Sequence, residues 1–281
     1  MLFQNNIFFN KVKDYSVSNE VFDLHHNPEY DLLITFPKPS LETLPNYYES
    51  DNYISHTDRS RTLFERIYRL IKSIAIKKKI SLINKHASKG NLLDIGAGTG
   101  SFLHAAKKDG WQTIGLEPSE KAKQFASLKG LKFVDKLNDI PTQSQDIITM
   151  WHVLEHVPNL DEYLFELKRI IKPTGTIFIA VPNFKSFDAS YYGKFWAAYD
   201  VPRHLWHFSK GSIQKLFSEK QMRLETVLPM KFDSYYVSLL SEKNRSGKNK
   251  PLRAFFVGLK SNYEAKQTKE YSSHIYVIKN E

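Results

Sequence analysis

The feature of this 281-residue sequence that most constrains its fold is the segment Asn91–Gly100, which reads NLLDIGAGTG. A short apolar run ends at Asp94 and Ile95, and three glycines then follow at alternate positions. Such a run predicts a buried strand, and the glycines permit the positive φ angles of a tight loop against which a ligand can lie. The segment therefore predicts a strand, a glycine loop and a helix, the place where α/β sheets bind nucleotide-like cofactors.

The spacing of these glycines restricts the cofactor. A dinucleotide fingerprint G-x-G-x-x-G would have its third small residue where Ser101 stands. Asp94 lies two residues before the first glycine, and its carboxylate would repel a pyrophosphate. The same carboxylate suits a cofactor that carries an ammonium and a sulfonium. A tight turn without any ligand is the alternative interpretation.

Strands and helices alternate after this loop, as a parallel sheet requires. The predicted strands begin at Leu92 and continue at 113–116, 133–134, 146–151, 176–181, 224–228 and 274–278. The predicted helices cover 60–86, 101–109, 119–129, 160–171 and 212–220, with Ser119 as an N-cap and with Pro173-Thr174-Gly175 ending the fourth. Two further helices are expected in an insertion at about 233–270, where 241–250 is predicted to be a mobile basic loop.

Composition excludes several classes of protein. The sequence has no cysteine, which excludes disulfides, thiolate zinc sites and cysteine nucleophiles, and it has no apolar run long enough to span a bilayer. A cytoplasmic location is the default expectation. The net charge of +10 is unevenly spread, with −6 in residues 1–58, +9 in 59–89, −1 in 90–200 and +8 in 201–281. Basic surfaces favour an anionic acceptor or peripheral membrane contact, although no nucleic-acid motif is evident; packing of the acidic arm on the basic helix is the alternative.

The pattern D-x-G-x-G-x-G after a strand resembles motif I of the class I S-adenosylmethionine-dependent methyltransferases. The run His152–Val157, HVLEHV, resembles the group of ubiquinone-type O-methyltransferases, and Leu167–Thr176 and Val181–Asn183 follow in the order of that group. The resemblance implies a Rossmann-like three-layer α/β/α sandwich, whose mostly parallel seven-stranded sheet has an antiparallel last strand. It also implies S-adenosyl-L-methionine as the cofactor.

The expected cofactor-binding residues follow two strand ends and the glycine loop. Glu117 closes the second strand, where a carboxylate accepts the ribose hydroxyls of an adenosine cofactor. By resemblance, the backbone near Trp151 and His152 lines the methionine part of the cofactor. The full expected set is Asp94, Gly96, Ala97, Gly98, Gly100, Glu117, Pro118, Trp151 and His152.

Catalysis is expected from histidines, because neutral imidazole suits general-base chemistry near neutral pH. The candidate bases are His152, His156 and His204, and the expected substrate-contacting residues are Glu155, Tyr199, Arg203 and His207. Arg203 could instead pair with Asp200 in a purely structural role. His204 and His207 have the spacing of metal ligands, but no third ligand is evident nearby, so no metal is predicted.

The remaining segments divide into an N-terminal accessory arm, 1–58, and a methyltransferase domain, 59–281, with a lid at about 184–210 and the insertion. Residues 14–24 predict a hairpin that turns at Ser18-Asn19. The sequence Thr35–Pro39, TFPKP, resembles the end of a zinc-binding unit found before related domains. Asn27 and Tyr30 occupy the matching cysteine positions, so the arm is expected to be a degenerate unit without metal.

These residues together predict a methyltransferase that transfers a methyl group to an O, N or C atom of an unidentified small-molecule or lipid-linked acceptor. Two alternatives stay open at this point. One is a non-catalytic module that binds S-adenosylmethionine or a partner. The other, less favoured by Asp94 and Ser101, is a nicotinamide-dependent oxidoreductase. The sequence sets no oligomeric state.

Overall fold

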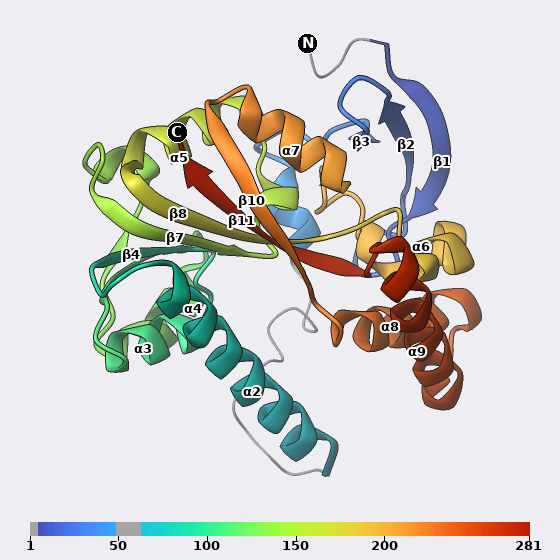
Figure 1. The fold of residues 1–281 in the computed structure, drawn as a ribbon. Coiled ribbons are helices and arrows are strands. Elements are labelled where there is room, and N and C mark those ends of the chain that lie inside the picture. Colours follow the sequence, from blue (N-terminus) through green and yellow to red (C-terminus); the bar gives the residue numbers. More distant parts are fainter. Residues whose placement is uncertain (1–4, 49–62) are drawn as a thin grey trace.

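The computed structural model describes residues 5–48 and 63–281. Within these residues the chain forms a large and a small sheet (Figure 1). The large sheet has seven strands in the order β10-β11-β8-β7-β4-β5-β6. Their bounds are β4 Asn91–Ile95, β5 Gln112–Leu116, β6 Phe133–Val134, β7 Gln145–Trp151, β8 Ile171–Pro182, β10 Met222–Pro229 and β11 Ser273–Asn280.

The strand directions confirm the expected fold class. Strand β4 pairs in parallel with β5 and β7, and β7 in parallel with β8, whereas β11 runs antiparallel to both of its neighbours, β8 and β10. The central parallel strands β4, β7 and β8 are buried on both faces, which explains their continuous apolar composition.

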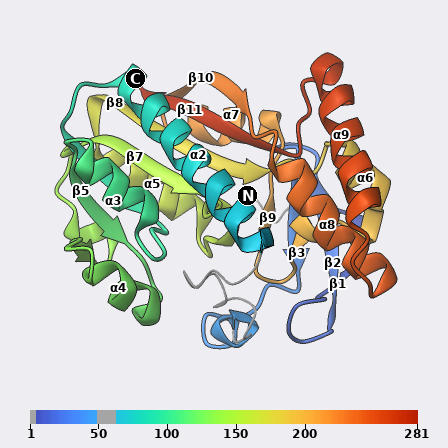
Figure 2. The same cartoon turned by 90° about the horizontal axis from the view of Figure 1, so that it is seen from below.

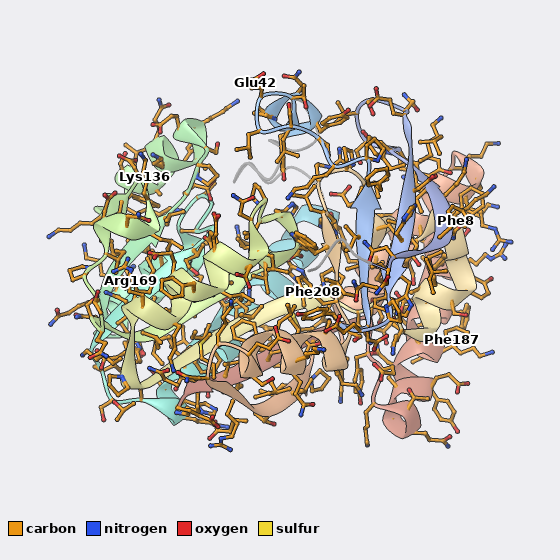
Figure 3. All side chains as sticks on the ribbon, turned by 90° about the horizontal axis from the view of Figure 1, so that it is seen from above. Phe8, Glu42, Lys136, Arg169, Phe187 and Phe208 are labelled. Carbon is orange, nitrogen blue, oxygen red and sulfur yellow. The ribbon has the colours of Figure 1, made fainter. Side chains whose placement is uncertain are left out.

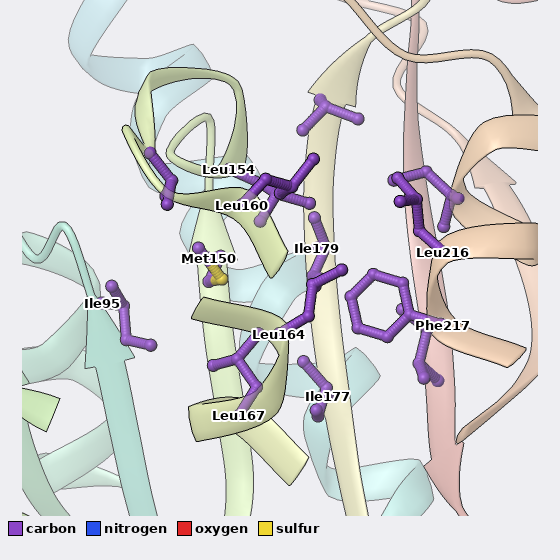
Figure 4. Close-up of a cluster of buried hydrophobic side chains, with 14 of the residues drawn as sticks. Ile95, Met150, Leu154, Leu160, Leu164, Leu167, Ile177, Ile179, Leu216 and Phe217 are labelled. Carbon is purple, nitrogen blue, oxygen red and sulfur yellow. The ribbon is translucent and has the colours of Figure 1, made fainter. Parts of the chain in front are cut away.

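Helices cover both faces of the large sheet and complete three layers. One face carries α5 Leu160–Ile170 and α7 Lys210–Ser218, whose apolar side chains form a single core with β4, β7, β8 and β11 (Figure 4). The other face carries α2 Leu63–His86, α3 Ser101–Lys108 and α4 Glu120–Ser127. Ser119 accepts a hydrogen bond from the Ala122 N–H, which confirms the predicted N-cap.

Helix α2 packs less of its length than its periodicity predicts. Ile83, near its C-terminal end, is fully buried, but Ile71 and Ile74 are 36% and 38% exposed. The helix crosses the sheet and extends beyond it (Figures 1 and 2). Leu63, Ile67 and Leu70, also predicted to pack, lie outside the residues whose side chains the structure describes. Amphipathic spacing alone does not reveal how much of a helix has a partner.

The small sheet joins the arm to the lid. Strands β1 Ile7–Lys13, β2 Val21–Asn27 and β3 Leu32–Phe36 form antiparallel neighbours, followed by the short 3₁₀ helix η1 Leu44–Tyr48. The fourth strand, β9 Trp206–His207, comes from the predicted lid and pairs with β3. Figure 3 shows Phe208, directly after β9, between the two sheets. The hairpin turns where predicted, but its strands extend beyond 14–24, because β1 ends at Lys13 and β2 runs from Val21 to Asn27.

Two predicted boundaries are wrong. Helix α5 ends at Ile170 and β8 begins at once, with Pro173-Thr174-Gly175 inside a register shift opposite Gln145 and Ile147 rather than in a turn that ends the helix. The predicted loop at 241–250 is mostly helical.

Helix α8 covers Asp233–Ser246, and α9, Pro251–Thr268, follows after a short connection. Burial explains why α8 continues through this polar stretch. Ser241 accepts the Ala197 N–H at 2.8 Å, and Glu242 accepts the Tyr192 hydroxyl. Helices α8 and α9 lie beside α6, Phe187–Tyr192 (Figure 1).

Candidate functional site

The glycine loop lies at the carboxyl end of β4. Gly96, Gly98 and Gly100 all have positive φ, of 69°, 53° and 71°. A Cβ on Gly96 would meet Val153 at 2.3 Å, and one on Gly100 would meet Leu131 at 2.3 Å, so these two glycines permit packing. A Cβ on Gly98 would meet no atom within 4 Å. Gly98 therefore presents bare backbone to open space, as a ligand cradle requires.

Glu117 lies against this loop, as predicted from its place at the end of β5. One carboxylate oxygen accepts the Gly98 N–H at 2.8 Å, and the other accepts the Ser119 N–H at 2.9 Å. These bonds orient the carboxylate, and each oxygen keeps a second lone pair for a ribose hydroxyl. The adjacent Pro118 is exposed. Strands β4 and β5 thus bring the glycine loop and its acidic partner together.

Asp94 is buried at the same end of β4. Among the described residues, the Thr149 hydroxyl on β7 supplies its one side-chain hydrogen bond, at 2.6 Å. Burial raises the pKa of Asp94 to about 7, although the Thr149 bond and the Lys79 ammonium act in the opposite direction. An acid so poorly compensated would bind a cationic ligand strongly, because the ligand would supply the missing charge.

Lys79 of α2 is a site residue that the sequence did not reveal. Its Nζ lies 4.1 Å from the centre of the Trp151 ring, a cation–π contact. Burial lowers the pKa of Lys79 to about 8, against the influence of Asp94 and Asp233. The Trp151 Nε1–H is buried and has no hydrogen-bond acceptor among the described residues. An open glycine cradle, an undercompensated acid and an unpaired indole donor together fit a polar, cationic cofactor.

His152 follows β7 in a left-handed conformation, with φ of 58°. Its Nε2 lies 3.1 Å from Asp233 at the start of α8, and its Nδ1 lies 3.4 Å from Glu155. Burial lowers the pKa of His152, but the nearby carboxylates of Asp233 and Glu155 outweigh this effect and raise it to about 10. His152 is therefore an imidazolium at neutral pH, which argues against the predicted role as a base.

His156 is the candidate base that is clearly neutral. Burial and the nearby His204 lower its pKa to about 4, although Glu155 and Asp200 act in the opposite direction. Its Nδ1 lies 3.0 Å from both the Arg203 carbonyl and the Tyr48 hydroxyl. The His204 ring stands edge-on to the His156 ring, with centroids 4.6 Å apart. The structure therefore brings together two predicted bases, one from the segment after β7 and one from the lid.

Arg203 braces the lid rather than facing a ligand. Its guanidinium bonds Asp200 at 2.7 Å, Asp14 of the arm at 2.9 Å and the Tyr47 carbonyl at 3.0 Å. Arg203 is 1% exposed, so its donors are used within the protein. Arg203 therefore shows the structural alternative, the pairing with Asp200, rather than the predicted substrate contact. Asp14 adds a second acidic partner, which comes from the arm.

Two other predicted substrate residues are also internal. Tyr199 packs edge-on against Trp196 and His207, and burial raises its pKa. The His207 Nε2 lies 3.1 Å from the Thr35 hydroxyl of β3, which itself donates to the His204 carbonyl at 2.6 Å. Burial lowers the pKa of His207 well below its usual value. Both residues hold the lid on the small sheet, so direct contact with a substrate is not indicated.

The comparisons with known proteins identify the family. The methyltransferase domain family matches residues 60–227. The chain belongs to this family. Ubiquinone biosynthesis O-methyltransferases from Coxiella burnetii and Rhodopseudomonas palustris are 32% and 31% identical over 126 and 127 residues. These matches cover 42% and 41% of this chain, and the chain spans about half the length of these curated relatives.

Solved structures support this methyltransferase domain at the level of the fold. A SAM-dependent methyltransferase from Archaeoglobus fulgidus superposes with a TM-score of 0.54 at 19% identity, over 78% of this chain and 98% of that one. Magnesium protoporphyrin IX methyltransferase from Synechocystis, with bound SAH, superposes with a TM-score of 0.56 at 13% identity, over 86% and 100%. The Rossmann-like fold and the expected cofactor class agree with the family, and the non-catalytic and nicotinamide alternatives are not favoured.

The arm, 1–58, precedes the residues that the family model matches. In place of the cysteines expected in a zinc-binding unit, the Asn27 side chain accepts the Tyr30 N–H at 3.0 Å and holds the turn before β3. His25 packs against Phe36, and His26 lies 3.3 Å from Asp31. The relation of this arm to a degenerate zinc unit remains a prediction.

Within the described residues, no helix combines the length and the apolarity needed to cross a membrane.

Proposed function

We propose that this chain is an S-adenosylmethionine-dependent methyltransferase. The observation that carries the proposal is the open backbone of Gly98 between two carboxylates, Asp94 and Glu117, at the ends of adjacent parallel strands. The cofactor supplies an electrophilic methyl group on a sulfonium. Because the sulfur leaves as a neutral thioether, the protein mainly has to align donor and acceptor, which can lower the barrier by about 7–11 kcal/mol.

Each residue of the site has a defined task in this proposal. Glu117 would accept the ribose hydroxyls, Asp94 would attract the cationic methionine end, and the loop backbone at Gly98 would lie against the ligand. A base is needed only when the acceptor atom carries a proton, and it then contributes about 10²–10⁴-fold to the rate. His156 and His204 are the candidates for this role, because His152 is already protonated.

A substitution that fills the cradle tests the cofactor assignment. Gly98→Ala adds a methyl group where the protein has no atom within 4 Å, so the folded protein should tolerate it apart from backbone strain. Gly247→Ala is the matched control, because Gly247 also has positive φ and open space but caps α8. Calorimetric titration with S-adenosylmethionine should show at least tenfold weaker binding for Gly98→Ala alone. Equal affinity in both variants would contradict the assigned cradle.

Turnover requires a second measurement. Incubation of the protein and cell extract with methyl-labelled cofactor should label an acceptor, and Asp94→Ala should abolish the label. Cofactor binding without any labelled product across extracts would favour the non-catalytic alternative.

We further propose that the acceptor is lipid-linked and is met at an anionic membrane surface. The supporting feature is the α8–α9 hairpin, in which residues 243–269 carry eight basic side chains and one acidic one. Large apolar side chains are exposed on the same hairpin: Tyr236, Leu252, Phe255, Phe256, Leu259 and Tyr263. Exposed aromatics among lysines are typical of surfaces that bind anionic bilayers. The hairpin begins at Asp233, which contacts His152 in the site.

Vesicle sedimentation tests this surface. The protein should bind vesicles that contain anionic phospholipid and not purely zwitterionic ones, and added salt should weaken binding. Phe256→Ser should reduce binding several-fold, whereas Phe165→Ser on α5 should not, because Phe256 and Phe165 are similarly exposed, at 63% and 61%. Equal loss in both variants, or equal binding to both vesicles, would contradict the proposal and favour a freely diffusing small-molecule acceptor.

A further inference from the structure

Three side chains beside the proposed site lie close enough together to hold a metal ion after a small adjustment. Glu155, His156 and His204 each offer a ligand atom, and these atoms all lie within 4.8 Å of one another. Glu155 and His156 belong to the short 3₁₀ helix η3, Leu154–His156, that follows β7, and His204 comes from the lid. Among the described residues this is the one group of its kind. Glu155 is 1% exposed and His204 is 8% exposed, so the group is enclosed.

The hydrogen bonds of the two imidazoles leave the other ring nitrogen for a ligand. The Nδ1 atom of His204 lies 2.9 Å from the Ala198 carbonyl, and that of His156 lies 3.0 Å from the Arg203 carbonyl. A carbonyl oxygen can only accept, so both Nδ1 atoms carry the proton. Metal-bound histidines commonly donate one N–H to a backbone carbonyl, which fixes the ring and directs the opposite nitrogen at the metal.

Glu155 supplies an independent observation, because its buried carboxylate lacks hydrogen-bond donors among the described residues. Both of its carboxylate oxygens are buried, and neither accepts a hydrogen bond from any described residue. Its nearest cation is the His152 ring, whose Nδ1 lies 3.4 Å from Oε1. A carboxylate withdrawn from water without hydrogen bonds is costly to fold around, and a coordinated cation removes that cost.

We propose that Glu155, His156 and His204 bind a divalent transition-metal ion. Two imidazoles and one carboxylate match Zn²⁺ best, and Co²⁺ is its usual spectroscopic substitute. Tetrahedral coordination at about 2.0–2.2 Å requires ligand atoms roughly 3.3–3.5 Å apart, so the side chains have to close by up to about 1.5 Å. Three protein ligands leave a fourth position for water or for an oxygen of an acceptor, as in catalytic zinc sites.

The rival occupant of this site is a proton. The His204 Nε2 lies 3.9 Å from Asp200, so a proton on that nitrogen would also supply a positive charge between Asp200 and Glu155. The Asp200 carboxylate is already held by the Arg203 guanidinium, whereas Glu155 shares the His152 ring with Asp233. The two occupants are distinguished by direct measurement of bound metal.

The test uses the full chain and Zn²⁺ or Co²⁺ without cofactor or acceptor. Metal-free protein should take up one ion per chain, and Co²⁺ should give the visible absorption bands of four-coordinate nitrogen–oxygen ligation. Glu155→Gln and His204→Gln should each weaken binding by at least about 100-fold, since even the outer partners of ligands are worth 10–100-fold. Far-UV circular dichroism checks that each variant is folded.

His207→Gln is the matched control, because His207 is a buried lid histidine three residues from His204 whose Nε2 is held by Thr35. It should keep the wild-type metal affinity within about threefold. No stoichiometric ion at micromolar Zn²⁺ would overturn the proposal in favour of the proton. Unchanged binding in folded Glu155→Gln would overturn it as well. Bound metal would remove His156 and His204 as candidate bases, but it would leave the cofactor cradle and methyl transfer themselves to be decided by the separate titration and labelling experiments.

Discussion

Replacement of Asp94 by asparagine should stabilise the folded protein and remove the protein's affinity for the cofactor. Burial raises the pKa of Asp94 from 3.8 to about 7. One pKa unit corresponds to about 1.4 kcal/mol, so ionising this side chain inside the protein costs about 4 kcal/mol at pH 8. Asparagine has no charge to bury and can still accept the Thr149 hydroxyl. Lys79 loses a nearby anion, so we expect a net stabilisation of about 1–3 kcal/mol.

The sign of the pH dependence follows from the raised pKa. Below about pH 4 the carboxyl group is protonated in both the folded and the unfolded chain, so Asp94 costs nothing there. As the pH rises toward 7 the unfolded chain loses the proton first, and the stability of the wild type falls relative to that of the variant. Above the folded pKa the difference becomes constant. The advantage of Asp94→Asn should therefore be small at pH 4.5 and largest near pH 8.

Urea unfolding at both pH values measures this difference, with Asp188→Asn as the matched control. Asp188 is also fully buried, but its carboxylate accepts bonds from Trp196, Ser261 and Ser272 at 2.8, 2.7 and 2.7 Å. Asparagine would direct an amide N–H at one of these donors, so Asp188→Asn should destabilise by about 1–3 kcal/mol. An Asp94→Asn variant that is less stable than wild type at pH 8 would refute the reasoning.

Three further outcomes follow from the site. Affinity for S-adenosylmethionine should rise by up to about tenfold per pH unit below pH 7 and then level off, because Asp94 must be ionised to attract the cation. An affinity that does not change with pH in calorimetric titrations would show that Asp94 does not bind the ligand. Arg203→Met should lower stability by about 3–5 kcal/mol in denaturant unfolding, because Asp14 and Asp200 lose their shared partner; a loss below 1 kcal/mol would contradict the bracing role. His152→Gln should reduce methyl transfer by less than about tenfold in steady-state assays, because its pKa of about 10 prevents it from acting as a base near neutral pH; a loss of 10²-fold or more would restore it as a candidate.

The fold could be predicted because its signals are local. Each buried strand appears as a short apolar run, and Ser119 begins α4 through a cap that involves three neighbouring positions. The errors arise where tertiary contacts override local preference. The polar residues of α8 predict a loop, but burial of Ser241 and Glu242 against the lid keeps them helical. Nothing in the sequence of the lid indicates that β9 would complete the small sheet.

The same distinction applies to the site. Gly98 and Glu117 were predictable because strand ends in a parallel sheet share one edge, so a motif and an acid about twenty residues later must meet. Lys79 and Asp233 were not predictable, because each lies on a helix whose position beside the site depends on tertiary packing. The role of Arg203 depended on Asp14, which is 189 residues away in sequence. Glu155 as a third ligand beside His204 could be recognised only from coordinates.

The hydrogen-bond partners of the buried acids separate structural acids from those that await a ligand. Asp14 accepts bonds from the backbone of its own turn and from Arg203, and Asp188 accepts three side-chain bonds, so both are fully compensated within the protein. Asp94 accepts one side-chain bond, and Glu155 accepts none from the described residues. Both undercompensated acids follow or end adjacent parallel strands, β4 and β7, at the edge where the glycine loop opens. A fold retains such costly carboxylates where bound cations compensate them, which supports a cationic cofactor at Asp94 and a metal ion at Glu155.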